Sequence, residues 1–178
     1  MRRGAQRRGL LVYGDPRLRE PCRRVEPGET GLADLVVRMR ELMLRHDGVG
    51  LAAPQLGEPL RLILAWPPDR RQGEPLVLLN PELRGVSART AVFDEGCLSF
   101  PGIYRPIRRP AVVTVGYLTL RGDPKQARSG GLLARILQHE IDHLDGVLLV
   151  DRLSSLRRNL YLRKRLREEN QPAGEQHG

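Results

Sequence analysis

The stretch His139-Glu140-Ile141-Asp142-His143 combines side chains that bind metals with one that can move protons. On a helix, His139 and His143 lie about 40° apart around the axis and one turn apart along it, so their imidazoles can converge on one cation. Glu140 points about 100° away from His139, so it is a poor ligand but a suitable base for a metal-bound water. The pattern predicts a metal-dependent hydrolase. Ordinary buried histidines beside a solvated glutamate are the alternative.

A third ligand is needed to decide between these interpretations. A catalytic zinc-type site usually has three protein ligands and a water, whereas a structural site is closed by four protein ligands. Further candidate ligands in the chain are His46, His177, Cys22 and Cys97. Cys97 follows Gly96, which permits close approach of the backbone, and a strand-like stretch at residues 91–93 leads into it. By itself Cys97 could equally be a small buried apolar residue.

The helix that carries the motif is predicted from Gly131 to Leu144. Gly146 supplies its stop signal. Apolar residues at helical spacing cover much of its circumference, so we expect the helix to be buried. These residues are Leu132, Leu133, Ile136, Leu137, Ile141 and Leu144.

Two more helices are predicted from apolar residues three and four apart. One spans about Gly31 to Arg45, and the other about Leu153 to Glu169, where basic residues such as Arg157 and Arg158 surround a leucine stripe. Short strands are predicted at Leu10–Tyr13, Leu60–Trp66, Leu76–Leu79 and Val112–Leu120.

The order of these elements lacks a βαβ rhythm and predicts an α+β fold. We expect mixed and antiparallel sheets packed around the central metal-binding helix, followed by a C-terminal helix. Residues 1–170 are predicted to form a single domain and residues 171–178 a disordered tail.

The basic charge is nearly all arginine, and a net charge of +9 favours phosphate-rich partners such as nucleic acid or a ribonucleoprotein. A compositional bias or heat adaptation explains the same charge equally well. No apolar run approaches the roughly 20 residues that span a bilayer, and no signal peptide is evident. We therefore expect a cytoplasmic protein without a membrane partner, in which Cys22 and Cys97 are not joined by a disulfide.

Three segments, in this order and at these separations, resemble the signature motifs of bacterial peptide deformylase. They are residues 48–55 (GVGLAAPQ), 95–99 (EGCLS) and 138–143 (QHEIDH). The resemblance implies that Cys97, His139 and His143 hold one divalent metal ion. It also implies Fe²⁺ in the cell, with Zn²⁺, Ni²⁺ or Co²⁺ able to replace it in purified protein; ligand softness alone does not choose among these metals.

The reaction implied by the resemblance is hydrolysis of the N-formyl group from the starting methionine of nascent polypeptides, which releases formate. Metal-bound hydroxide would attack the formyl carbon, with Glu140 as general base and then general acid. The side-chain amide of Gln55 and the backbone N–H of Leu98 would stabilise the oxyanion.

The resemblance also implies how the substrate binds. Gly50 would let the formyl-Met peptide pair in extended form, and Val49, Leu132 and Ile136 would line the pocket for the methionine side chain. Asp142 is expected to support the site without being a ligand. No role is assigned to Tyr104 or Arg105.

The basic C-terminal helix has two interpretations. In some members of the family such a helix docks on the ribosome, so its arginines could bind ribosomal RNA; a solvated helix face is equally consistent with the sequence.

Two other functions compete with deformylation as interpretations of the motif helix. A general metallopeptidase usually takes a third ligand downstream of the motif helix, where the only histidine after Gly146 is His177 and the first glutamate is Glu168 on the last helix, so an upstream Cys97 fits better. An RNA-binding module with a structural metal would need a fourth protein ligand.

Overall fold

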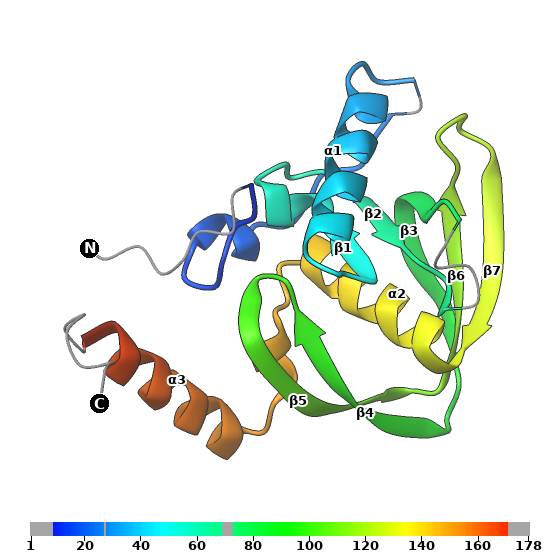
Figure 1. The fold of residues 1–178 in the computed structure, drawn as a ribbon. Helices are drawn as coiled ribbons and strands as arrows, with labels where there is room; N and C mark the ends of the chain where they lie inside the picture. The colour runs from blue at the N-terminus through cyan, green and yellow to red at the C-terminus, as the bar shows by residue number, and fades with distance from the viewer. Residues whose placement is uncertain (1–8, 27, 69–72, 171–178) are drawn as a thin grey trace.

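The computed structural model describes residues 9–26, 28–68 and 73–170 and has the α+β fold that the sequence predicts (Figure 1). The helices are α1 (Leu32–Arg45), α2 (Gly131–Leu144) and α3 (Ser155–Asn170), with 3-10 turns η1 (Pro16–Arg19), η2 (Ala53–Leu56) and η4 (Leu149–Arg152). The strands are β1 (Gly50–Ala52), β2 (Leu62–Ala65), β3 (Leu76–Val86), β4 (Thr90–Cys97), β5 (Phe100–Pro110), β6 (Val112–Leu118) and β7 (Pro124–Gly130).

The strands form two sheets, in which every strand pair is antiparallel. The larger sheet has the order β1-β2-β3-β6-β7, and β4 and β5 form a separate two-stranded sheet. The one parallel pairing among the described residues is an isolated bridge between Arg23 and Leu60. The cysteine of the second motif therefore lies on a different sheet from the strands that pack on α2.

Alternating residues of β2 pack against two different helices. Leu62 and Leu64 belong to the apolar cluster that includes the buried face of α1, whereas Ile63 and Ala65 belong to the cluster that includes α2. This follows from the two-residue period of a strand, which turns successive side chains to opposite faces. Sheet and helices thereby form layers, with β2 between α1 and α2.

Helix α2 is the buried centre of the fold, as its apolar pattern predicts. Its bounds agree with the prediction, and each residue from Ala134 to Leu144 is buried, including the polar ones. In Figure 1 the helix runs between the larger sheet and the β4–β5 hairpin. Its buried polar side chains must therefore find partners within the protein, since an unpaired buried charge is costly.

The N-terminal segment departs from the sequence prediction. Leu10–Tyr13 is not a strand, and that prediction was wrong. The backbone N–H of Leu11 donates to the carbonyl of Gln55 at 2.7 Å, and that of Tyr13 donates to the carbonyl of Ser99 at 2.9 Å. The segment makes one backbone bond to each of two separate parts of the chain and so forms no ladder.

Three strands lie where the sequence patterns predicted none. They are β1 within a glycine-rich stretch, β5 with prolines at both ends and in its interior, and β7, which is largely polar. Local pattern did not identify them because glycine and proline are depleted in strands and β7 has little apolar alternation.

Helix α3 is attached to the rest of the fold through Tyr161, which is buried against the rings of Tyr13 and Phe100 at centroid distances of 5.9 and 6.2 Å. Figure 1 shows the helix beside the hairpin, on the side away from the larger sheet. Within the described ranges, none of the helices has the length and apolar character needed to cross a bilayer. The predicted tail at residues 171–178 lies outside those ranges.

Candidate metal centre

Three side chains from two elements converge at the proposed metal site. Cys97 comes from the end of β4, and His139 and His143 come from adjacent turns of α2; their ligand atoms all lie within 4.8 Å of one another. The Sγ atom of Cys97 is 3.2 Å from Nε2 of His143. One thiolate and two imidazoles at this spacing fit a single divalent cation with an open coordination position.

Glu95 determines which ring nitrogen of His139 can bind a metal. Nδ1 of His139 lies 3.1 Å from Oε2 of Glu95. Burial raises the pKa of Glu95, but hydrogen bonds from His139 and Arg109 more than offset this and lower it to about 2, so the group is a carboxylate. A carboxylate only accepts hydrogen bonds, so Nδ1 carries the proton and Nε2 is left to bind a metal.

Two arginines neutralise the buried Glu95 carboxylate. Arg109 donates to both of its oxygens at 2.7 and 2.9 Å, and Arg135 donates to Oε1 at 2.9 Å. Arg135 also donates to the carbonyls of Ile107 and Ala91, and so ties both strands of the hairpin to α2. Each of the three charged side chains is nearly inaccessible to solvent, which makes their mutual pairing necessary.

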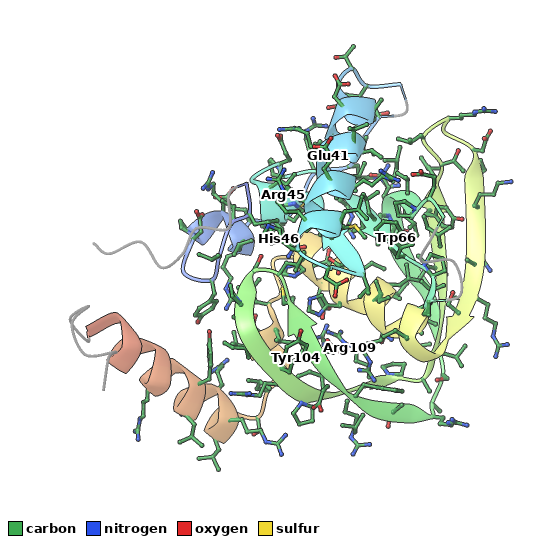
Figure 2. The ribbon with its side chains drawn as sticks, viewed as in Figure 1. Glu41, Arg45, His46, Trp66, Tyr104 and Arg109 are labelled. Carbon is green, nitrogen blue, oxygen red and sulfur yellow. The ribbon has the colours of Figure 1, made fainter. Side chains whose placement is uncertain are left out.

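Asp142 extends this network away from the proposed metal. Arg109 donates to it at 2.7 Å, and Arg152 of η4 pairs with both of its oxygens. Figure 2 shows Arg109 on the hairpin pointing toward α2. The network thus connects the cysteine-bearing hairpin to the histidine-bearing helix. This placement agrees with the expectation that Asp142 supports the site without being a ligand.

The two histidines have pKa values shifted in opposite directions. Burial lowers the pKa of His139, but hydrogen bonds with Cys97 and Glu95 outweigh it and raise the value well above normal. Burial, together with the charges of His139 and Arg109, lowers the pKa of His143 well below normal. An imidazole binds a metal through a deprotonated nitrogen, so a cation would find His143 already neutral and would displace the second proton of His139 from Nε2.

Glu140 is a buried carboxyl group whose burial is only partly compensated by the charges of His139 and Arg109. Its Oε2 has no hydrogen-bond partner among the described residues, and burial raises the pKa of the group to about 7. A carboxyl with a pKa near neutrality can accept and return a proton at physiological pH. Glu140 lines the same cavity as Cys97 and His139.

The side-chain amide of Gln55 lies beside Cys97. It is 2% exposed, and its Nε2 lies 3.7 Å from Sγ of Cys97 and 3.1 Å from Oγ of Ser99. The side chain of Leu98 packs where a β-carbon on Gly48 would stand, at 2.9 Å. The contact with Cys97 places an amide N–H of Gln55 beside a proposed metal ligand, and Leu98 follows that ligand directly in the chain.

A cavity of about 310 Å³ opens beside these groups. Val49, Gly50, Leu132 and Ile136, the four residues expected to contact substrate, all line it. Tyr104 lies at its edge, 68% exposed, with its ring over Gly96, its partner on β4 (Figure 2). The cavity therefore combines apolar walls with the polar groups of the centre, as expected for a small-ligand site.

The other candidate ligands do not join the group. Cys22 is buried in the apolar cluster with α2, where burial raises its thiol pKa to about 11. His46 lines the cavity but is not one of the three converging residues, and His177 lies outside the described residues. Cys22 and Cys97 are both free thiols, as expected.

Sequence reasoning missed the polar residues that support the centre. Glu95 and Ser99 stand in the quoted second motif, so their proximity to Cys97 was a usable signal. Nothing in the sequence distinguishes Arg109, Arg135 and Arg152 from the many other arginines, because their partners come from distant parts of the chain.

The chain is similar to known proteins over most of its length. Residues 8–159 match the sequence model of the family described as polypeptide deformylase. A peptide deformylase of Thermosynechococcus vestitus is 45% identical over 147 residues, which cover 82% of this chain and 78% of the relative. The crystal structure of a peptide deformylase from Legionella pneumophila aligns with a TM-score of 0.81 at 40% identity, covering 92% of this chain and 98% of that chain. One from Synechococcus elongatus, in complex with actinonin, aligns with a TM-score of 0.79 at 41% identity, covering 87% and 84%.

Proposed function

The chain belongs to the polypeptide deformylase family, and we propose how its own residues perform the reaction of that family, hydrolysis of the N-formyl group from the starting methionine of nascent polypeptides. One observation carries the proposal. Three ligand atoms lie within 4.8 Å of one another, and two of their residues share a cavity with a buried carboxyl group, one oxygen of which lacks a hydrogen-bond partner among the described residues.

Cys97, His139 and His143 would hold the metal. A divalent cation held there would supply Lewis acidity, which would lower the pKa of a bound water to about 7 and favour the charge that develops on a carbonyl oxygen. From the resemblance to the family we propose Fe²⁺ as the metal in the cell, with Zn²⁺, Ni²⁺ or Co²⁺ as replacements in purified protein; a thiolate with two imidazoles suits each of these ions. Glu95 supports metal binding at this site because it directs Nε2 of His139 toward the other two ligands.

Glu140 would move the proton. Its carboxylate accepts a proton from the attacking water and then passes it to the leaving amine, so that one group serves as base and then acid. The pKa of about 7 that burial gives Glu140 supports both steps, because the two protonation states are close in free energy at neutral pH.

Gln55 and Leu98 would stabilise the oxyanion of the tetrahedral intermediate. An amide N–H of Gln55 and the backbone N–H of Leu98 would serve as donors fixed before the reaction begins, which lower the barrier more than mobile ones. The burial of Gln55 and its contacts with Cys97 and Ser99 support this role.

The substrate would bind along β1. This strand pairs only with β2 in the larger sheet, so its other edge can accept an extended peptide at Gly50. The methionine side chain would enter the apolar part of the cavity, formed by Val49, Leu132 and Ile136. Leu132 is 46% exposed without ligand, and burying it would contribute to binding.

The C-terminal helix would bring the enzyme to its substrate. We propose that α3 docks on the ribosome, where Arg157 and Arg158 would contact RNA phosphates. Leu156 and Leu160 are 70% and 58% exposed on the same helix, while Tyr161 anchors it to the domain. Cosedimentation with ribosomes should weaken as salt increases and should be lost on deleting residues 156–178; unchanged binding would contradict docking.

The activity is tested by formate release from a formyl-Met peptide. Protein loaded with Fe²⁺ without oxygen should release formate, and chelation should abolish the reaction. Cys97→Ser should weaken metal binding, because a neutral hydroxyl replaces a soft thiolate; Cys22→Ser is the matched control and should leave the metal bound. Release of formate by metal-stripped protein would overturn the mechanism, and cleavage of the peptide bond instead would indicate a metallopeptidase.

A further inference from the structure

The hydroxyl group of Ser99 is buried beside the candidate oxyanion donor. Ser99 is completely inaccessible to solvent, and its Oγ lies 3.1 Å from Nε2 of Gln55. It follows Leu98 directly and Cys97 by two positions. A buried hydroxyl is retained only where it hydrogen-bonds, so its partner defines its role.

The amide of Gln55 has hydrogen-bond partners at both its oxygen and its nitrogen. Its Oε1 accepts a hydrogen bond from the backbone N–H of Ala52 at 2.9 Å. The two N–H bonds of a planar amide diverge by about 120°, so one can point to Oγ of Ser99 while the other points to the side of Cys97, whose Sγ is 3.7 Å away. The direction of the second N–H is therefore set by what binds the first.

The backbones on both sides of this hydrogen bond are also tied together. Leu11 donates to the carbonyl of Gln55, and Tyr13 donates to the carbonyl of Ser99. Residues 11–13 thus connect η2 to the turn that follows Cys97. They keep the two side chains at hydrogen-bonding distance without using either of them.

We propose that Ser99 is a positioning residue for deformylation: its hydroxyl takes one N–H of Gln55 and thereby aims the other at the oxyanion. The inference rests on the proposed role of Gln55. Without the hydroxyl, a buried N–H loses its acceptor, and the amide gains alternative orientations in which the donor is misdirected. Ser99 itself touches neither metal nor substrate in this scheme.

The kinetic test is a double-mutant cycle of Ser99→Ala and Gln55→Ala in the metal-loaded enzyme. We expect Ser99→Ala to lower kcat about tenfold with KM changed less than about twofold, since the donor acts on the transition state. In the Gln55→Ala background, the same change should lower kcat less than about twofold. Equal losses in both backgrounds would overturn the inference, as would no loss in either.

A second measurement does not depend on activity. In zinc-loaded protein, the side-chain amide protons of Gln55, assigned by their absence in Gln55→Ala, should exchange slowly with solvent, and about tenfold faster in Ser99→Ala. The matched control is Ser87→Ala, which removes a serine hydroxyl that also accepts one N–H, that of Val112 between β3 and β6; it should change neither exchange nor kcat. Unchanged Gln55 exchange in Ser99→Ala would overturn the inference.

The two measurements separate the inference from the proposed function. If Gln55→Ala keeps the wild-type rate, the oxyanion role of Gln55 fails, and with it the kinetic part of the inference. If kcat falls in Gln55→Ala but not in Ser99→Ala, Gln55 keeps its role as oxyanion donor and the positioning role of Ser99 is overturned.

Discussion

Gly50 and Glu140 are in such close contact that a β-carbon on Gly50 would stand 2.4 Å from Oε1 of Glu140. It would also lie 2.7 Å from Ile136, which forms part of the proposed methionine pocket. Strand β1 thus approaches the proposed base as closely as a backbone can, and only glycine allows the approach.

Gly50→Ala should therefore disable the enzyme. The added methyl group must displace Glu140 or β1, at a cost of about 1–3 kcal/mol in the free energy of unfolding and a larger relative loss in kcat/KM. Gly85→Ala in β3 is the control, because its β-carbon would meet only ordinary contacts at 3.8 Å. Urea unfolding and formate release measure the two effects. Full activity in Gly50→Ala would show that β1 and Glu140 do not need this approach.

The pH profile of kcat/KM should have an acid limb that belongs to Glu140. Burial raises its pKa to about 7 and a bound cation lowers it again, so the limb should lie at or below pH 7. Glu140→Gln should lower kcat by about 10²–10⁴-fold. Asp94→Asn, which neutralises another acid lining the cavity, should keep the wild-type profile. A Glu140→Gln enzyme within tenfold of wild type would contradict the assignment.

Stripped of metal by a chelator, Glu140→Gln should be more stable than wild type above pH 7. A carboxyl whose pKa is raised from 4.5 to about 7 on folding contributes stability that is fully present below pH 4.5 and lost as the pH rises through 7. The glutamine should therefore gain roughly 3 kcal/mol above pH 7 and nothing below pH 4.5. Urea unfolding at pH 4 and pH 8 measures the difference. An equal gain at both pH values would rule out this charge effect.

Glu95→Gln should weaken both metal binding and the fold. The amide leaves Arg109 and Arg135 without their full counter-charge, which should cost about 3–5 kcal/mol. It also keeps only one acceptor oxygen for the two arginines and His139, so the imidazole is less firmly oriented and metal affinity should fall about 10–100-fold. Competition with a chelator measures the affinity.

The matched control for Glu95→Gln is Glu82→Gln, which breaks exposed pairs with Arg24 and Arg84 and should cost no more than about 1 kcal/mol.

The contribution of Glu95 to the free energy of unfolding should depend on pH. The pKa of Glu95 is lowered to about 2, so its contribution is present above pH 4.5 and lost as the pH falls through 2. A Glu95→Gln variant whose stability follows the wild-type pH dependence in this window would contradict the role of the carboxylate.

Local sequence pattern determined the features that depend on neighbouring residues. The apolar spacing of α2 is set within 14 residues, so its bounds and its burial could be predicted, and the spacing of His139 and His143 on it follows from helix geometry. The same local pattern failed at Leu10–Tyr13, where an apolar run suggests a strand but each backbone bond goes to a different partner.

Tertiary structure alone decided how the centre is held together. Arg109 binds Glu95 and Asp142 at separations of 14 and 33 residues, and Arg135 binds Glu95 at 40. The hydrogen bond between Ser99 and Gln55 spans 44 residues. An arginine or serine carries no local signal of a buried partner, because pairing depends on which distant backbone brings an opposite charge or a donor within 3 Å. The sequence therefore determined which residues can perform the chemistry, and the fold determined which residues position them.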